Sequence, residues 1–415
     1  MEEHPLLRPV EAFPVQQDGK TLIYLRDPAH FAETLVVTPA GYFVLAHFDG
    51  RHSLVDIQEA YAKRTGQALP ADELNKMLEM LDRKYFLYNQ RFLDREKEIV
   101  DDFRRQSIRA AAHVGGVYSP EPDKLNAQLL GYFTAANGPG AVQPDGARST
   151  PRALVAPHID FHRGGPCYAW AYKELIEKPC ADLYILLGTS HCAGESPFVA
   201  TMKDFATPLG NVETDKSFVQ RLQQAYNGDL FADEYLHRTE HSLEFQAVYL
   251  KYAAAERARL TGENRPFKIV PILVTSFHMN LRSRVLPEKD RPIGDFLKAL
   301  ADLAAQESRR VCFVAGVDLA HVGAQFGDRD PITPEFLQWV EAEDRTLIDK
   351  VAAADTEGFF NEIAKDQDRR RICGFSPLYS LAYLMRGHQG RLLKYDQAFT
   401  QETASAVTFT SMVYD

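Results

Sequence analysis

The sequence lacks the features that mark a disulfide-stapled or membrane-spanning protein. Its 415 residues include five cysteines, and no two of them form a Cys-x-x-Cys motif. An odd, sparse set of this kind predicts neither a disulfide framework nor a zinc ribbon. No apolar run reaches the roughly 18 residues that span a bilayer, and residues 1–5 lack the basic start and apolar stretch of a signal peptide. We therefore expect a cytoplasmic protein that does not contact a membrane.

Basic side chains are fewer than acidic ones. The chain has 47 basic and 57 acidic side chains, which gives a net charge of -10. A surface of this sign does not favour nucleic acid or anionic lipid. Hydrophobic residues make up 45% and charged residues 25%, as in globular proteins of two or three domains that bury a large core.

The first region, residues 1–95, combines strands with short helices. Apolar runs at residues 21–25, 34–37 and 86–88 are typical of strands, and residues 38–41 are typical of a turn. Ser53 is expected to cap a short helix that ends at Gly66. A second helix follows Pro70, with apolar residues at helical spacing: Leu74, Met77, Leu78, Leu81 and Tyr85. These elements predict a small winged-helix-like α+β domain.

The segment Asp-Gly-Arg-His-Ser-Leu-Val-Asp-Ile, residues 49–57, resembles peptide-chaperone domains of the PqqD type, and the resemblance covers roughly residues 20–92. It implies that this domain holds a peptide, with a radical-SAM enzyme and its protein or peptide substrate as partners. Winged helices also bind DNA, but acidic side chains outnumber basic ones in residues 1–110, so no nucleic-acid partner is expected. Residues 96–107 are highly charged and predict a solvated linker helix.

The third region, residues 108–415, alternates between apolar strands and helical stretches. The strands are expected at residues 153–157, 183–188, 267–274, 311–317 and 406–414, and a helix at 168–175. Strands that are apolar throughout are buried on both sides. The region therefore predicts an α/β fold with a central, mainly parallel sheet and helices on both faces.

A histidine follows three of these strands closely. His158, His191 and His321 come after the strands at 153–157, 183–188 and 311–317. A single histidine in such a place is more often structural than a ligand. Three of them at strand ends, where open α/β sheets bind ligands, indicate a shared site.

A metal site there needs neutral imidazoles or anionic ligands. His158 and His191 supply two nitrogens. Cys373 precedes a glycine and an expected helix start, where a helix N-terminus stabilises a thiolate. Cys192 is adjacent to His191 and competes for the same role, so spacing alone does not choose between them.

A set of ordered segments between residues 105 and 415 resembles the MEMO family, whose bacterial members are also called AmmeMemoRadiSam system protein B. The segments that carry the resemblance are residues 109–118, Ala156-Pro157-His158, residues 187–191, 207–210, 240–244, 270–274, 318–321 and Ile372-Cys373-Gly374. Each is short, but their order along one chain is specific. The family's fold resembles class III extradiol dioxygenases, which hold non-haem iron by two histidines and a carboxylate.

The resemblance implies roles for five residues. His158 and His191 are the implied imidazole ligands, and Cys373 stands where the dioxygenases keep a carboxylate. A thiolate is a softer ligand, so Fe²⁺ is expected, with copper or zinc as alternatives, and ordinary ring cleavage is not. His321 resembles the general acid/base histidine, and Asp318 is expected to orient it.

Five further residues are pocket-lining candidates because they depart from, or extend, the family's motifs: Asp160, His162, Cys192, His241 and Glu244. For Cys192 packing is the favoured alternative, and for Glu244 a helix start is equally favoured. His237, His278 and His388 are expected to face solvent. The leading hypothesis is a metal-dependent redox protein or oxidoreductase acting on an unknown small molecule. The alternative is a non-catalytic metal- or peptide-binding partner of a radical-SAM modification system.

Overall fold

The computed structural model describes residues 3–144, 146 and 149–415. The chain forms two compact units. The smaller comprises Met1–Arg105, Gly323–Pro331 and Thr400–Ser405, and the larger comprises Gln106–Val322, Ile332–Phe399 and Ala406–Asp415. Among the described residues, no helix combines the length and apolarity that crossing a bilayer requires.

The smaller unit contains a three-stranded antiparallel sheet in the order β1-β2-β3, with bounds Glu11–Gln17, Lys20–Arg26 and Leu35–Val37. The β1–β2 hairpin turns at Asp18-Gly19, where both residues have positive φ (51° and 71°). A two-residue hairpin turn needs this backbone, and Asp-Gly adopts it readily.

Four helices complete the smaller unit: α1 (Pro39–Leu45), α2 (Leu54–Thr65), α3 (Ala71–Arg83) and α4 (Gln90–Arg105). Ser53 caps α2 in a reciprocal capping box with Asp56, and Gly66 ends the helix at φ 73°, as the sequence predicts.

Two predictions for this unit are wrong. Residues 38–41 do not form a separate turn, because the Thr38 side chain accepts the N–H of Gly41 and starts α1. Residues 86–88 do not form a strand but a single bridge between Leu7 and Leu87. One apolar cluster, which includes Leu25, Val44 and Leu78, joins the sheet to the helices.

The larger unit is built on an eight-stranded sheet in the order β11-β13-β5-β10-β6-β9-β7, with β12 paired to β13. The bounds are β5 Ala153–Ala156, β6 Leu183–Thr189, β7 Phe198–Ala200, β9 Lys268–Val274, β10 Val311–Gly316, β11 Asp318–Gly323, β12 Gly390–Thr400 and β13 Ser405–Tyr414. The four central strands, β5-β10-β6-β9, are parallel, and β13 and β7 run antiparallel to their neighbours β5 and β9. A separate pair joins β4 (Ile108–Arg109) to β8 (Asp204–Phe205).

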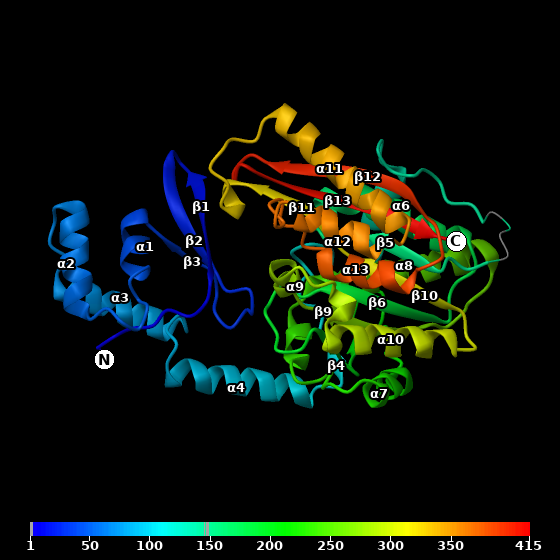
Figure 1. Ribbon diagram of the computed structural model, residues 1–415, viewed down its shortest axis with the longest axis horizontal. Helices are drawn as coiled ribbons and strands as arrows, with labels where there is room; N and C mark the ends of the chain where they lie inside the picture. The colour runs from blue at the N-terminus through cyan, green and yellow to red at the C-terminus, as the bar shows by residue number, and fades with distance from the viewer. Residues whose placement is uncertain (1–2, 145, 147–148) are drawn as a thin grey trace. The chain divides into compact units, whose positions relative to one another are not determined.

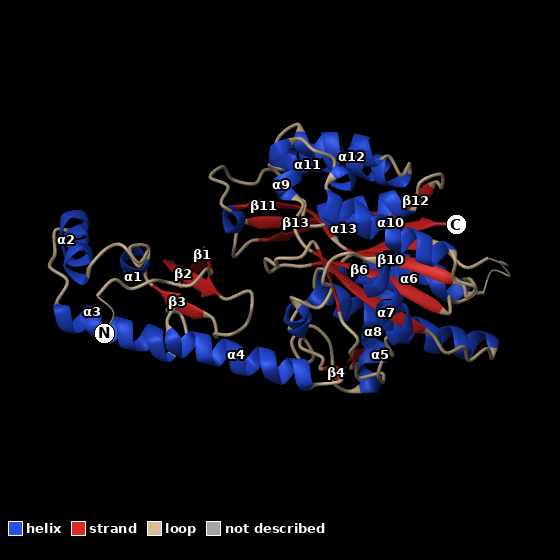
Figure 2. Ribbon diagram, turned by 60° about the horizontal axis from the view of Figure 1, so that its bottom comes forward, coloured by secondary structure: helices blue, strands red, loops and turns tan. Residues whose placement is uncertain are grey.

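Helices cover both faces of this sheet (Figures 1 and 2). Helices α6 (Phe161–Glu177) and α8 (His241–Thr261) contact one face, and α7 (Lys216–Ala225), α10 (Arg291–Ala305) and α13 (Phe375–Leu384) pack on the other. Every residue of β6 is buried, with Ile185 and Leu187 in one apolar cluster and Tyr184 and Leu186 in the other. Alternate side chains of a strand point to opposite faces, so β6 lies inside a two-sided core. The α/β fold with a parallel centre is confirmed.

The remaining α-helices of the larger unit are α5 Pro122–Thr134, α9 His278–Ser283, α11 Pro334–Ala352 and α12 Thr356–Ala364.

Two glycines let the start of α8 lie directly against the carboxyl ends of the central strands. A Cβ on Gly188 of β6 would come 2.5 Å from the Ser242 hydroxyl, and a Cβ on Gly316 of β10 would come 2.5 Å from the Ser242 carbonyl. A glycine is required wherever backbone approaches this closely. The approach brings His241, the first residue of α8, to the edge where β5 and β6 end.

Candidate metal centre

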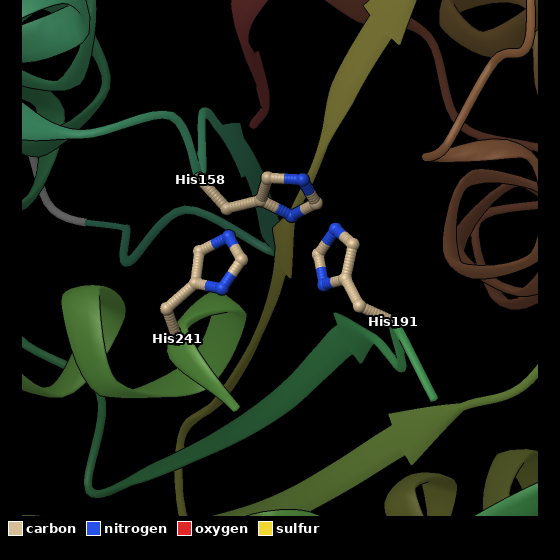
Figure 3. Close-up of side chains that lie close together, drawn as sticks. All are labelled: His158, His191 and His241. Atoms are coloured by element: carbon tan, nitrogen blue, oxygen red, sulfur yellow. The ribbon is translucent and has the colours of Figure 1, made fainter. Parts of the chain in front are cut away.

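Three histidines from three elements converge at the carboxyl edge of the parallel strands. His158 follows β5, His191 follows β6, and His241 opens α8. One ring nitrogen of each lies within 4.8 Å of those of the other two, and Figure 3 shows the rings facing a common space. Among the residues that the structure describes, this is the one group of three or more such side chains with that spacing. The chain thus gathers imidazoles that are far apart in sequence.

His158 is the buried member of the cluster. Its Nδ1 donates to the carbonyl of Gly316 at 3.0 Å, which leaves Nε2 as the nitrogen with a lone pair. Burial lowers the pKa of His158 well below its ordinary value, so the ring is neutral at physiological pH. A neutral imidazole whose other nitrogen is anchored to a carbonyl is the form that ligates metals.

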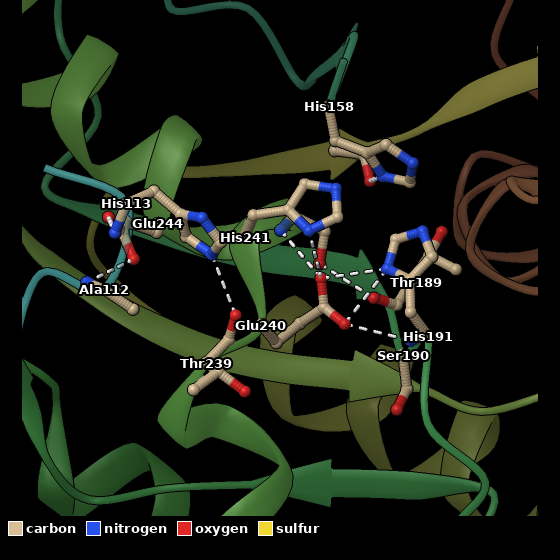
Figure 4. A network of polar contacts seen from close by, with 12 residues as sticks. Ala112, His113, His158, Thr189, Ser190, His191, Thr239, Glu240, His241 and Glu244 are labelled. Atoms are coloured by element: carbon tan, nitrogen blue, oxygen red, sulfur yellow. Dashed lines mark hydrogen bonds and ion pairs between the residues drawn. The ribbon is translucent and has the colours of Figure 1, made fainter. Parts of the chain in front are cut away.

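Glu240 organises the other two histidines. Its carboxylate accepts the Nδ1–H of His191 at 3.0 Å and lies 3.3 Å from Nδ1 of His241, and it also accepts backbone N–H groups of His191 and Ser242 (Figure 4). Burial alone raises the pKa of Glu240, but the two imidazoles and the N–H donors outweigh it and hold this pKa well below its usual value. A carboxylate behind an imidazole fixes the ring's tautomer and orientation.

Cys373 lies beside His158, with 3.2 Å between its Sγ and the Nε2 of His158. The loop that carries it is held against β11, because Cys373 N–H donates to Leu319 and Gly374 N–H donates to Asp318. A Cβ on Gly374 would meet the Asp318 carbonyl at 2.6 Å, so this close approach depends on glycine. Cys373 is nevertheless not one of the three residues whose donor atoms all lie within 4.8 Å.

The thiol of Cys373 is not activated in the way that its place before α13 predicts. Burial raises the pKa of Cys373 well above its ordinary value, because loss of solvation disfavours the thiolate, and the nearby Asp318 carboxylate raises this pKa further. Without a cation nearby the sulfur is therefore protonated.

Asp318 and His321 lie on β11, the short strand that directly follows β10. The Asp318 carboxylate accepts the N–H of His158 at 3.0 Å and lies 3.6 Å from its Nε2. Burial raises the pKa of Asp318 to about 6. His321 donates from Nδ1 to the Leu319 carbonyl at 3.1 Å, and burial lowers its pKa.

Three of the pocket-lining candidates have identifiable surroundings outside the histidine cluster. Asp160 caps α6 by accepting the N–H of Arg163, and it pairs with that side chain. His162 is exposed on α6. Cys192 is half-buried and packs against one of the two apolar clusters. The histidine cluster includes none of them.

Glu244, the fourth candidate, sits in a buried network one turn along α8 from His241. Its carboxylate pairs with Arg109, which is fully buried, and accepts the Tyr118 hydroxyl and the N–H groups of Ala112 and His113. Glu244 thereby anchors residues 109–118, whose His113 ring meets that of His241 edge to face at 5.6 Å.

Sequence reasoning missed Glu240 and misplaced His237. Glu240 stands immediately before His241 in a segment that already carried the family resemblance, so its adjacency was an available signal. His237 does not face solvent: it is 1% exposed, and its Nε2 donates to the Val199 carbonyl. His237 lies in a short 3₁₀ turn, Glu234–Arg238, beside the buried Leu236.

Comparison with known proteins identifies the family to which this chain belongs. A family model described as "Memo-like protein" matches residues 109–413. A MEMO1 family protein of Aquifex aeolicus is 28% identical over 414 residues, which is 98% of this chain and 99% of the relative. One from Thermus thermophilus is 26% identical over 88% of this chain and 99% of its own, and one from Methanothermobacter thermautotrophicus is 25% identical over 65% and 85%. The Aquifex alignment includes the smaller unit.

Proposed function

Because this chain belongs to the Memo-like protein family, we propose that it is a metal-dependent redox protein whose larger unit holds one transition-metal ion, with Fe²⁺ preferred and copper or zinc as alternatives. The observation that carries the proposal is the convergence of His158, His191 and His241 within 4.8 Å. In this proposal the protein is an oxidoreductase acting on a small molecule.

The donor set fits a transition-metal ion. It offers three imidazoles, a thiol 3.2 Å from one of them and the Asp318 carboxylate 3.6 Å from the same nitrogen. Imidazole and sulfur ligands suit iron, copper and zinc, whereas magnesium and calcium take oxygen ligands. We assign His158, His191 and Cys373 as ligands of the ion. His241 supplies an additional imidazole within 4.8 Å of the other two.

A bound iron ion would supply one-electron redox chemistry. The protein's own groups have separate tasks. Glu240 holds His191 and His241 in place, and Asp318 holds His158 through its backbone N–H. We assign His321 to hold or move a proton, because its pKa is lowered by burial and the ring is neutral near pH 7.

Cys373→Ala tests the sulfur ligand. Co²⁺ replaces Fe²⁺ as a spectroscopic probe, and a bound thiolate gives it an intense near-ultraviolet charge-transfer band. We expect the wild-type protein and the matched control Cys192→Ala to show that band, and Cys373→Ala to lose it while retaining weaker Co²⁺ binding through the imidazoles. A band that survives in Cys373→Ala and disappears in Cys192→Ala would reverse the assignment.

Glu240→Gln tests the carboxylate behind the histidines. The substitution keeps the shape of the side chain but removes the charge that orients His191 and His241, so we expect Fe²⁺ affinity to fall about 10- to 100-fold. The measurement is an anaerobic competition titration against a chromophoric chelator. Glu234→Gln, in the preceding 3₁₀ turn, is the control and leaves the affinity unchanged. Equal affinities for wild type and Glu240→Gln would remove Glu240 from the site.

A second candidate function is a non-catalytic peptide-binding partner of a radical-SAM modification system. The observation that favours it is the smaller unit's sheet, which ends at β3, with Val36 43% exposed. An edge strand accepts an extended peptide by strand addition. Oxygen consumption by the iron-loaded protein with candidate substrates supports the enzyme. Peptide binding by full-length protein without such consumption supports the carrier.

A further inference from the structure

A second set of polar side chains lies at the same edge of the sheet but outside the histidine cluster. Ser276 follows β9, His278 opens the short helix α9, and Asp368 lies in the loop before Cys373. The Ser276 Oγ is 2.6 Å from Nδ1 of His278, and Nε2 of His278 is 2.7 Å from a carboxylate oxygen of Asp368. The three side chains form one continuous hydrogen-bonded line.

The protonation of this line follows from its partners. The Asp368 carboxylate accepts, so Nε2 of His278 carries the hydrogen and Nδ1 keeps a lone pair. That lone pair accepts the hydroxyl hydrogen of Ser276. This is the arrangement in which an imidazole takes the proton of a serine nucleophile while a carboxylate holds the ring.

The Asp368 end of the line is buried and the Ser276 end is exposed, as a serine nucleophile with an orienting acid requires. The Asp368 side chain is 3% exposed, the His278 side chain is 47% exposed, and Ser276 is exposed. A buried carboxylate is fixed and poorly solvated, while an exposed hydroxyl can be reached by a substrate. Met279, which follows His278 in the chain, is 69% exposed and offers apolar surface to an acyl chain.

Contacts with other residues also hold Asp368, His278 and the backbone beside Ser276 in place. Asp368 accepts the N–H of Ile372 at 2.8 Å, and the His278 ring meets the Phe375 ring edge to face at 5.9 Å. The N–H of Phe277 donates to the Ser376 hydroxyl at 3.0 Å, which fixes the backbone beside Ser276. The Ser276 oxygen additionally accepts the backbone N–H of His278 at 3.2 Å. This contact is compatible with the line, because a hydroxyl oxygen has two lone pairs.

We infer that Ser276, His278 and Asp368 form a second catalytic centre, a serine nucleophile with its base and orienting acid, that hydrolyses small carboxylic esters without a metal ion. Ser276 Oγ forms a bond to the acyl carbon as its proton passes to Nδ1 of His278. The ester C–O bond breaks, and the leaving alcohol takes that proton. Water then attacks the acyl carbon as one of its protons passes to Nδ1 of His278. The bond between Ser276 Oγ and the acyl carbon breaks, His278 returns the proton to Oγ, and the carboxylic acid is released.

A fluorophosphonate probe, which reacts with activated serines, tests the nucleophile directly. We expect the full-length wild-type protein to gain one probe per chain, located at Ser276 by peptide mapping, with and without EDTA. Ser276→Ala loses the label. The matched control Ser283→Ala keeps it, because Ser283 ends helix α9 and donates to the Asn280 carbonyl. Absence of label at Ser276 in wild-type protein overturns the proposal.

Hydrolysis of p-nitrophenyl acetate tests the base and the acid. We expect Ser276→Ala and His278→Gln to lower the rate at least about a hundredfold, and Asp368→Asn, which keeps an oxygen for the N–H of Ile372, to lower it as well. Thermal unfolding of each variant establishes that it is folded. If folded Ser276→Ala and His278→Gln variants hydrolyse the ester as fast as Ser283→Ala does, the proposal is wrong. These outcomes do not depend on metal binding, so they leave the histidine cluster untested.

Discussion

A His158→Ala variant is expected to lose stoichiometric iron. Removing a residue that only orients a metal ligand lowers metal affinity by up to about 100-fold, and we expect removal of the ligand His158 itself to lower Fe²⁺ affinity by more than that. His158 is the buried member of the cluster, its ring is neutral, and its Nε2 is near Cys373 and Asp318 as well as the other imidazoles. Alanine removes the nitrogen common to all these contacts. Metal content after anaerobic loading and gel filtration measures the effect.

The matched control for this variant is His162→Ala. His162 lies four residues further along the chain but is exposed on α6, so its loss leaves iron content unchanged. Retention of one iron per chain by His158→Ala, or equal loss from His162→Ala, would mean that iron binds elsewhere. Far-ultraviolet circular dichroism separates loss of the ligand from loss of the fold.

Glu244→Ala is expected to destabilise the larger unit by about 3–5 kcal/mol, the typical effect of removing one partner of a buried ion pair. The side chains of Arg109 and Glu244 are 0% and 1% exposed. Alanine leaves the guanidinium buried without its counter-charge and also frees the N–H groups of Ala112 and His113. The N-terminal segment of the unit then loses its anchor on α8.

Urea unfolding followed by tryptophan fluorescence measures this effect, because both tryptophans, Trp170 and Trp339, belong to the larger unit. Lys124→Ala is the control: its ion pair with Glu121 is exposed, and such pairs contribute about 0–1 kcal/mol. Replacing both partners, as Arg109→Met with Glu244→Leu, is expected to recover part of the loss. A Glu244→Ala midpoint equal to that of Lys124→Ala would show that the pair is not stabilising.

The parallel centre of the sheet and two of its histidines could be predicted from sequence for a simple physical reason. Strands buried on both sides are apolar throughout, so they stand out, and whatever polar residue follows them is brought to one edge. His158 and His191 follow β5 and β6 in that way. The capped helices of the smaller unit are equally local: Ser53 and Gly66 identify α2 without reference to the rest of the chain.

The positions of the other site residues depend on contacts between segments that are distant in the sequence. Glu240 is not a residue that usually caps a helix, and only the folded structure shows its carboxylate between His191 and His241. His241 reaches the cluster because Gly188 and Gly316 leave room for the start of α8, which no spacing in the sequence reveals. The Asp160 side chain caps α6, a contact that the sequence analysis did not predict.

The Ser276 line illustrates the same limit. Ser276 and His278 are neighbours in the sequence, but Asp368 is 90 positions away, and nothing in its surroundings marks it as their partner. His278 was expected only to face solvent. It is half-exposed, as expected, and the buried carboxylate on its other side is what gives it a chemical role.

The most direct test of the central claim is a crystal of the full-length protein, loaded anaerobically with Fe²⁺, measured on both sides of the iron absorption edge. Three imidazoles that fold to within 4.8 Å of one another predict a single strong anomalous peak about 2.0–2.2 Å from Nε2 of His158 and from a ring nitrogen of His191, with Cys373 Sγ also in bonding range. A peak at any other position, or no peak in protein that carries iron in solution, would contradict the account.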